Sequence, residues 1–276
     1  MPLTEAAARL QFAAIGTLKQ RQKDRIAAKH RPKISAFFRS QKRQVLDALA
    51  QQKYLFEESY RRMLTEGTIQ LTLAHWDRIW DDIASDSLSG LQQAIFSTEV
   101  DGVSAGAAQL QKQIGLFDKG KSFNLANPRA VGWFQQTGGS VDYIKGIQRT
   151  TGDSLKRVIG TALDEGWSYS RTAREIQKLY DGPISLARAQ RIAVFESGQS
   201  YEEGNRLFAE NLKDEGIQME EKWMTSQDEK VRPEHTANMA EGWVPMGHTF
   251  SSGHDGPPTD PGCRCYMIWR QAPTKR

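Results

Sequence analysis

The chain has 276 residues, of which 25% are charged and 38% hydrophobic, and its net charge is +4. This length and polar composition fit one large soluble domain or two ordinary ones. No apolar run approaches the ~20 residues that a membrane span needs, so we expect no membrane partner. The first residues also lack the charged and apolar regions of a signal peptide, and we therefore expect folding in a reducing cytosol.

The N-terminal region is basic. Between Lys19 and Arg43, ten Lys or Arg residues accompany one acid, Asp24. Their spacing places charge all around a helix, which is typical of a solvated helix or a disordered arm. It also suits docking on an acidic protein or salt-dependent, sequence-independent contact with DNA phosphates. The residues predicted to make these protein or nucleic-acid contacts are Lys19, Arg21, Lys23, Arg25, Lys29, Arg31 and Lys33.

Helical periodicity dominates the first 114 residues. We predict a polar helix over 4–31 that Pro32 ends, and a second helix from there to about residue 64. A further helix carries Trp76, Ile79, Trp80 and Ile83 on one face. Glycines after it predict helices broken by flexible joints, at Gly90, Gly102 and Gly106.

The middle of the chain, over 115–139, is rich in Gly, Asn and Ser and reads as an irregular connection with one short helix near 129–136. Four helices follow at 141–149, 150–166, 168–181 and 185–212. Thr150 or Thr151 is predicted to cap the second of these, and Ser168 or Ser170 the third. The division into domains is thus 1–114 helical, 115–139 connecting and 140–276 C-terminal module.

The helix over 185–212 carries a stripe of small side chains that would let another backbone approach closely. The stripe consists of Leu186, Ala189, Ala193, Glu196, Ser200, Gly204, Leu207 and Asn211. Glu196, in its middle, is either partly exposed at the helix edge or buried and paired with an arginine such as Arg191 or Arg174.

Hydrophobic alternation replaces helical spacing after Gly216. Met219, Glu221 and Trp223 fall on one face of a predicted strand, and Cys263, Cys265, Met267 and Trp269 alternate in a second. Two such strands predict a small antiparallel sheet packed on the preceding helices. The fold class is therefore α+β and mostly helical, with an elongated helical N-terminal half and a C-terminal helical module that backs the sheet.

The segment from 223 to 265 concentrates the residues with chemical potential. It holds both cysteines and three of the five histidines. The cysteines fit free thiols, metal ligands or buried core residues. His235, His248, His254 and nearby aspartates also supply the residue types of a metal-dependent hydrolase or nuclease, but without a recognised catalytic spacing.

A specific resemblance rests on ordered motifs in this half of the chain. Arg188-Ala-Gln-Arg-Ile-Ala-Val-Phe-Glu196 is followed by Trp223, Asp228, Arg232 and His235, and then by Pro257-Pro-Thr-Asp260-Pro-Gly-Cys263-Arg-Cys265. This order resembles the phage Mu F-like head morphogenesis family, the minor head proteins of tailed bacteriophages, over roughly 142–269. The resemblance implies that Glu196, Trp223, Asp228 and Arg232 are structural motif residues.

One variant of that family has a Cys-x-x-Cys pair at the positions of Arg232 and His235, together with a histidine near Asp260, and these residues form a metal cluster. Arginine cannot ligate a cation. The remaining set of His235, Asp260, Cys263 and Cys265 fits a tetrahedral zinc site. The alternative is a metal-free module in which Arg232 contacts Asp228 or Asp260.

The resemblance implies a non-enzymatic minor capsid protein inside the virion, at the portal vertex, and in the host cytoplasm during assembly. Its expected partner is the phage portal protein, with the major capsid or scaffolding protein and packaged DNA as further partners. It requires no cofactor, and a structural zinc is the one cofactor that the residues would fit. The alternatives are a nonspecific DNA-associated head protein and a hydrolase, nuclease or toxin-related enzyme.

Overall fold

A computed structural model describes residues 5–53, 73–114, 123–137, 141–184 and 186–273. The chain forms two compact units, each assembled from separate segments. The sheet unit comprises Met1–His30, Phe96–Gln136 and Arg191–Arg276, and the helical unit comprises Arg31–Ile95 and Thr137–Gln190. Both units draw residues from either side of the boundaries that the sequence suggests at 114 and 140, and those boundaries stay a prediction.

Helices account for most of the described residues, and one small sheet completes the fold, which confirms the predicted mostly helical α+β class. The helices are α1 (Glu5–Gln51), α3 (Leu73–Gln113), α4 (Pro128–Thr137), α5 (Val141–Asp164), α6 (Tyr169–Asp181), α7 (Leu186–Asp214) and α8 (Pro233–Ala240). The strands are β1 (Met219–Met224), β2 (Val244–Pro245) and β3 (Tyr266–Gln271). None of the described helices has the length and apolar character needed to span a membrane.

Several predicted helix breaks are wrong, and the first is at Pro32. Pro32 lies inside α1, which continues to Gln51. An internal proline costs about 3 kcal/mol, but buried side chains on both sides, such as Ile26 and Ile34, favour helix through this point. The predicted helix beyond residue 53 lies outside the described residues.

The break expected at Thr150 is also absent, because α5 is continuous. The Thr150 hydroxyl donates to the Gly146 carbonyl, and the Thr151 hydroxyl donates to the Ile147 carbonyl, each four residues earlier in the same helix. Threonines that bond back in this way do not cap a new helix. At the next helix the prediction is confirmed: Ser168 caps α6 by accepting from the Arg171 amide.

The three glycines of α3 are not joints, since α3 runs through all of them, and Gly102 and Gly106 mark close packing. A Cβ added at Gly106 would lie 1.9 Å from the Tyr201 carbonyl oxygen of α7. A Cβ at Gly204 of α7 would lie 2.1 Å from the Val103 carbonyl oxygen of α3. The small-residue stripe therefore brings the two backbones together, as its spacing predicts.

The helical unit has a polar network in its core. Gln41 of α1 donates to Gln148 of α5 at 2.8 Å and accepts from the Tyr180 hydroxyl of α6. Arg188 donates to Thr150 and Thr151 and lies over the Phe38 ring. In α6 the buried residues are Thr172, Ile176 and Tyr180, whereas Ala173 and Leu179 are half-buried.

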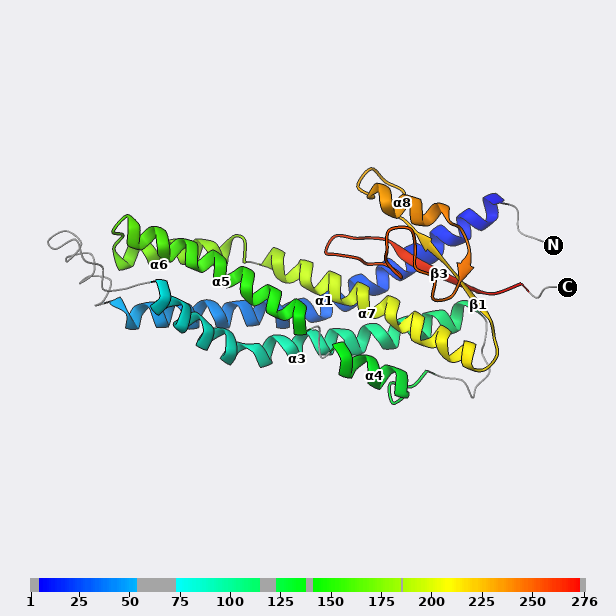
Figure 1. Ribbon diagram of the computed structural model, residues 1–276, viewed down its shortest axis with the longest axis horizontal. Coiled ribbons are helices and arrows are strands. Elements are labelled where there is room, and N and C mark those ends of the chain that lie inside the picture. Colours follow the sequence, from blue (N-terminus) through cyan, green and yellow to red (C-terminus); the bar gives the residue numbers. More distant parts are fainter. Residues whose placement is uncertain (1–4, 54–72, 115–122, 138–140, 185, 274–276) are drawn as a thin grey trace. The chain divides into compact units, whose positions relative to one another are not determined.

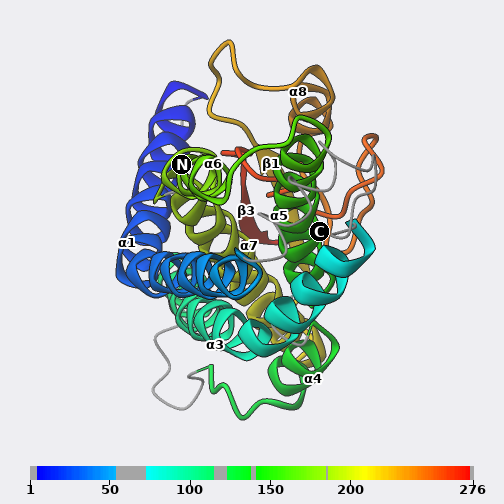
Figure 2. The same cartoon turned by 90° about the vertical axis from the view of Figure 1, so that its left-hand side faces the viewer.

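The sheet has the order β2-β1-β3, with antiparallel pairing that sets Trp223 opposite Met267. The long strands β1 and β3 lie side by side in both views (Figure 1, Figure 2). One face of the sheet packs Trp223, Met267 and Trp269 against Leu110 of α3 and Phe208 of α7. This arrangement confirms the predicted antiparallel sheet and its packing on the preceding helices.

Side chains of the opposite face meet the beginning of α1. The Tyr266 hydroxyl donates to the Phe12 carbonyl at 3.2 Å, and the Phe12 ring packs edge-on against Trp243. Neighbouring strand residues point to opposite faces, so Tyr266 and Met267 attach the sheet to different helices. The sheet thus lies between the first turns of α1 and the α3–α7 pair.

Candidate functional site

His235 is placed by the start of α8. Pro233 occupies the first turn of this helix, where its missing N–H leaves no bond unmade, and Arg232 precedes it in an extended conformation. The imidazole of His235 is 3% exposed, and its ring lies 5.2 Å from the ring of Trp223, which is fully buried. The strand β1 and the helix α8 therefore fix the histidine from two sides.

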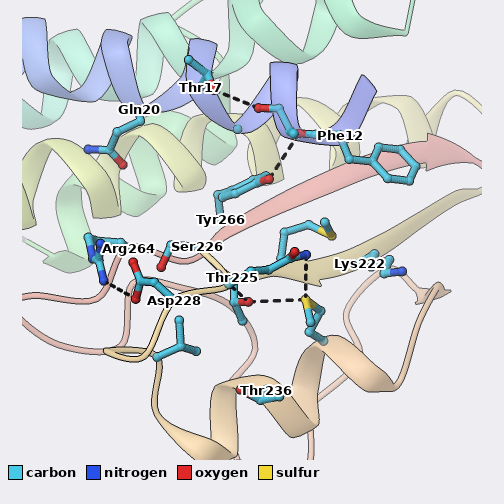
Figure 3. A pocket seen from close by; sticks show the side chains of 16 residues that line it. Phe12, Thr17, Gln20, Lys222, Thr225, Ser226, Asp228, Thr236, Arg264 and Tyr266 are labelled. Atoms are coloured by element: carbon cyan, nitrogen blue, oxygen red, sulfur yellow. Dashed lines mark hydrogen bonds and ion pairs between the residues drawn. The ribbon is translucent and has the colours of Figure 1, made fainter. Parts of the chain in front are cut away.

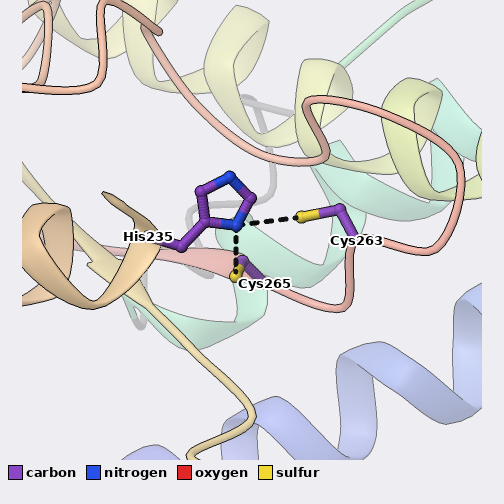
Figure 4. Close-up of side chains that lie close together, drawn as sticks. All are labelled: His235, Cys263 and Cys265. Carbon is purple, nitrogen blue, oxygen red and sulfur yellow. Dashed lines mark hydrogen bonds between the residues drawn. The ribbon is translucent and has the colours of Figure 1, made fainter. Parts of the chain in front are cut away.

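Cys263 and Cys265 complete a compact group with His235, which we call the His235 cluster. His235 Nδ1 lies 3.5 Å from Cys265 Sγ and 3.8 Å from Cys263 Sγ (Figure 4). All ligand atoms of the cluster lie within 4.8 Å of one another. The Cys-x-Cys spacing just before β3 puts both sulfurs on one side of an extended segment, which brings them to the same nitrogen.

A second contact orients the imidazole. Thr259 Oγ1 donates to Asp260 Oδ2 at 2.9 Å and lies 3.2 Å from His235 Nε2. Because the Thr259 proton is directed to the carboxylate, its oxygen is free to accept from Nε2–H. Nδ1 is then left with its lone pair toward the two sulfurs. This arrangement prepares His235 to accept a hydrogen bond from a thiol or to ligate a metal.

The two thiols titrate as a pair. A hydrogen bond from Cys265 is the main cause that lowers the pKa of Cys263, to about 5, with His235 contributing. The same bond, together with burial, raises the pKa of Cys265. One proton is thus shared between the sulfurs, and a thiolate is available where a cation could bind.

The cluster fits three of the four ligands of a structural zinc ion. Zinc bonds of about 2.0–2.1 Å to nitrogen and 2.3 Å to sulfur place tetrahedral ligand atoms about 3.6 Å apart. The two nitrogen–sulfur distances of 3.5 and 3.8 Å bracket that value. A bound zinc ion would supply a cross-link between α8 and the segment that leads into β3.

Asp260, the fourth predicted ligand, is not part of the cluster. Its Oδ1 accepts from Arg232 at 2.6 Å, and its Oδ2 accepts from Thr259. The contact between Arg232 and Asp260 is one of the two that the metal-free alternative predicts. Asp228, the other predicted partner of Arg232, instead accepts from Arg264 at 2.7 Å.

The remaining histidines of the segment do not join the His235 cluster. His248 Nε2 lies 2.7 Å from Glu241, and His254 is exposed, with its carbonyl accepting from the Phe250 amide. Within the described ranges, His235 with the two cysteines is the one group of His, Cys, Asp or Glu that could hold a metal ion. The residue types of a hydrolase are present, therefore, but they are spread over separate contacts.

The basic stretch of α1 divides into buried and exposed cations. Lys19 and Lys23 are buried and pair with Glu202 of α7 at 3.1 and 2.6 Å, and we call these three residues the Lys19 cluster. They cannot contact a portal protein or DNA while α1 stays in place, which corrects the prediction for these two lysines. Among the other five, Arg31 is half-buried and donates to Gln190, whereas Arg21, Arg25, Lys29 and Lys33 are exposed.

The Lys19 cluster was missed in the sequence because lysine is rarely buried without a partner, and the partner lies 183 residues away. Burial lowers the pKa of Lys19 to about 8 against the attraction of Glu202. Burial alone would raise the pKa of Glu202, but Lys19 and Lys23 together lower it below its usual value. Lys19 also donates to the Met267 carbonyl at 2.6 Å.

Two of the structural motif residues, Glu196 and Trp223, are buried. Glu196 is 1% exposed within α7, which excludes the partly exposed alternative. Trp223 is fully buried in the core shared by the sheet and the helices. Both therefore belong to the interior of the sheet unit.

Comparison with known proteins gives a family match in this part of the chain. Residues 153–268 match the family model described as Phage Mu protein F like protein. No curated protein and no solved structure shows a significant match to the chain. The matched region is similar to this family and contains α6, α7, α8, β1, β2, the first residues of β3 and the His235 cluster.

Proposed function

We propose that the chain is a minor head protein of a tailed phage that associates with the portal vertex inside the head during assembly. The observation that carries the proposal is the family match over 153–268, the region in which Trp223, His235 and the cysteines close a small structural module. The module acts as a rigid support in this proposal. It has no catalytic role.

The exposed surface of the N-terminal helices is the proposed portal contact. In the sheet unit, Arg21 and Arg25 are exposed and lie one turn apart on α1, so both can meet the same acidic surface. The major capsid or scaffolding protein is a further proposed partner of the same helical region. In this proposal the exposed arginines contact the partner, and the buried Lys19 cluster holds α1 in place.

The test is co-expression of the full chain with the portal protein of the same phage. We expect a stable complex by size-exclusion chromatography with light scattering, and the chain in purified heads by mass spectrometry. The double variant Arg21→Glu, Arg25→Glu should weaken the complex, while Lys213→Glu, an exposed change on α7, should not. Absence of the chain from purified heads would contradict the proposal.

Nonspecific DNA association is the second candidate, favoured by the exposed arginines of α1. With Lys19 and Lys23 buried, only part of the basic stretch can neutralise phosphates. We expect weak binding that falls steeply with salt. A gel-shift assay with the full chain at low and moderate salt tests this candidate. Binding unchanged by the Arg21→Glu, Arg25→Glu variant would exclude this surface.

A further inference from the structure

The sheet unit contains an open groove that the His235 cluster and the Lys19 cluster do not use. It encloses about 1070 Å³ between the first turns of α1, the exposed face of the sheet and the segment that leads into α8 (Figure 3). A volume of this size is at the upper end of those that bind ligands. The lining residues are Phe12, Ala13, Gly16, Thr17, Gln20, Lys222, Met224, Thr225, Ser226, Gln227, Asp228, Val231, Thr236, Met239, Arg264 and Tyr266.

Hydrogen bonds fix the walls of the groove. The α1 wall is held to the sheet by the bond from the Tyr266 hydroxyl to the Phe12 carbonyl. On the opposite wall, the Thr225 hydroxyl donates to the Met239 sulfur at 3.4 Å. The groove is therefore built into the folded unit, since the sheet is attached to α1 on one side and to α8 on the other.

The lining combines adaptable apolar side chains with many groups that form hydrogen bonds. Met224, Met239 and Phe12 provide apolar surface, and methionine adjusts its shape to different apolar partners. Thr17, Gln20 and the residues of the 225–227 turn provide hydroxyl and amide groups. Such groups can pair with the N–H and C=O groups of an extended peptide, which otherwise lose their bonds to water on binding.

The charge of the groove is positive. Asp228 is the one acid among the lining residues, and it is already bound by Arg264 at 2.7 Å and by the Lys230 amide at 3.0 Å. Lys222 of β1 is half-buried and has no acidic side chain within salt-bridge distance in the part of the chain that the structure describes. The ammonium group of Lys222 can thus pair with an acidic group of a bound ligand.

We propose that this groove binds an extended peptide segment of a partner protein, in which acidic side chains alternate with apolar ones. A carboxylate of the segment pairs with Lys222, and the apolar side chains enter between Met224, Met239 and Phe12. The open shape and the row of hydroxyl and amide groups favour a chain over a compact small molecule. This proposal does not depend on the proposed head association.

The first test measures binding of labelled 12-residue peptides to the full chain by fluorescence anisotropy. The three probes alternate Glu with Leu, Lys with Leu, and Glu with Ser. We expect the Glu–Leu peptide to bind at least ten-fold more tightly than either of the others. Equal affinity for all three peptides overturns the proposal, as does competition by succinate at the peptide's own concentration, which would indicate a small-molecule site.

Two variants locate the binding. Lys222→Glu should weaken the Glu–Leu peptide at least five-fold and strengthen the Lys–Leu peptide, because the charge preference of the groove is reversed. Thr17→Trp should fill the groove from α1 and weaken binding at least ten-fold. Lys230→Glu, a matched charge reversal outside the lining, should stay within two-fold of the wild type.

Melting temperature and circular dichroism establish that each variant is folded. If Thr17→Trp does not fold, the reversal by Lys222→Glu still decides the question, because this side chain is half-buried at the rim. Unchanged affinities in Lys222→Glu overturn the proposal. The assay contains no portal protein or heads, so its failure leaves the head association untouched.

Discussion

Two groups of ionisable side chains attach other elements to the same strand of the sheet unit. The Lys19 cluster joins α1 and α7 to the beginning of β3, where Lys19 donates to the Met267 carbonyl. The His235 cluster joins α8 to the segment that enters β3. The Lys19 cluster consists of lysine and glutamate, which usually lie in water. The His235 cluster consists of histidine and cysteine, which usually bind metals or remain buried.

The difference between the clusters lies in what each does for the backbone. In the order β2-β1-β3, β3 is an edge strand, whose outer N–H and C=O groups need partners. The Met267 amide donates to Glu202 at 3.4 Å, the Met267 carbonyl accepts from Lys19, and the Trp269 carbonyl accepts from Gln113. Helix side chains thus provide hydrogen-bond partners for this edge. The His235 cluster, in contrast, only fixes the position of the segment that leads into β3.

The largest effect is expected from Glu202→Gln, which leaves two buried lysines without their counter-charge. Breaking a buried ion pair by removing one partner costs about 3–5 kcal/mol of unfolding free energy. Denaturant unfolding measures this loss. Replacing Lys19, Lys23 and Glu202 together by methionine should restore part of the stability, because no buried charge remains although the Met267 amide and carbonyl lose their partners. A triple variant as unstable as Glu202→Gln would show that these backbone contacts matter as much as the unpaired charges.

The next effect concerns the His235 cluster and zinc. We expect added zinc to raise the melting temperature of metal-depleted protein by several degrees, because metal bound only by the folded state stabilises it. His235→Ala and Cys265→Ser should abolish this rise, and elemental analysis should detect zinc only in the wild type. If the protein binds no zinc, hydrogen bonds alone hold the His235 cluster together.

A smaller, pH-dependent effect is expected from Glu221, a buried carboxylate that accepts from the Gly247 and His248 amides at 2.9 and 3.2 Å. Burial raises its pKa from 4.5 to about 7, although these amides, His248 and Arg206 oppose the change. The contribution of Glu221 to stability is therefore full below pH 4.5 and falls as the pH rises to about 7, by up to about 1.4 kcal/mol per pH unit.

Unfolding by denaturant at pH values from 4.5 to 7 measures this slope. In Glu221→Gln, which mimics the protonated carboxyl, the slope should be reduced by the part that Glu221 contributes. Identical slopes in the variant and the wild type would show that the environment of Glu221 is more polar than its burial indicates. The two buried carboxylates, Glu221 and Glu202, would then differ only in the groups to which they are hydrogen-bonded.

The smallest effect is expected from Arg232→Ala. Arg232 and Asp260 are 43% and 38% exposed, and solvent-exposed ion pairs contribute about 0–1 kcal/mol. Double-mutant analysis with Asp260→Ala measures the coupling free energy. A value above about 2 kcal/mol would mean that this pair, and not the His235 cluster, closes the segment in the absence of metal.

The sequence predicted what depends on local pattern. Alternation around Trp223 and Met267 gave both long strands, and small residues at helical spacing gave the close contact at Gly204. Pro32 was misread because burial on both sides of it is a tertiary effect that local propensity does not contain. Lys19 was misread for the same reason, since nothing near it in the chain indicates Glu202. In the His235 cluster, the cysteines and histidine were recognised, but the role of Thr259 required coordinates.

The bond between Lys19 and Met267 spans 248 residues of sequence. During synthesis the beginning of α1 is made long before the strand that it meets. Lys19 and Lys23 therefore stay in water until α7 and β3 have been made, because their partners belong to these elements. Contacts of such sequence separation slow folding. A chain that lacks β3 therefore cannot close the sheet unit in this way.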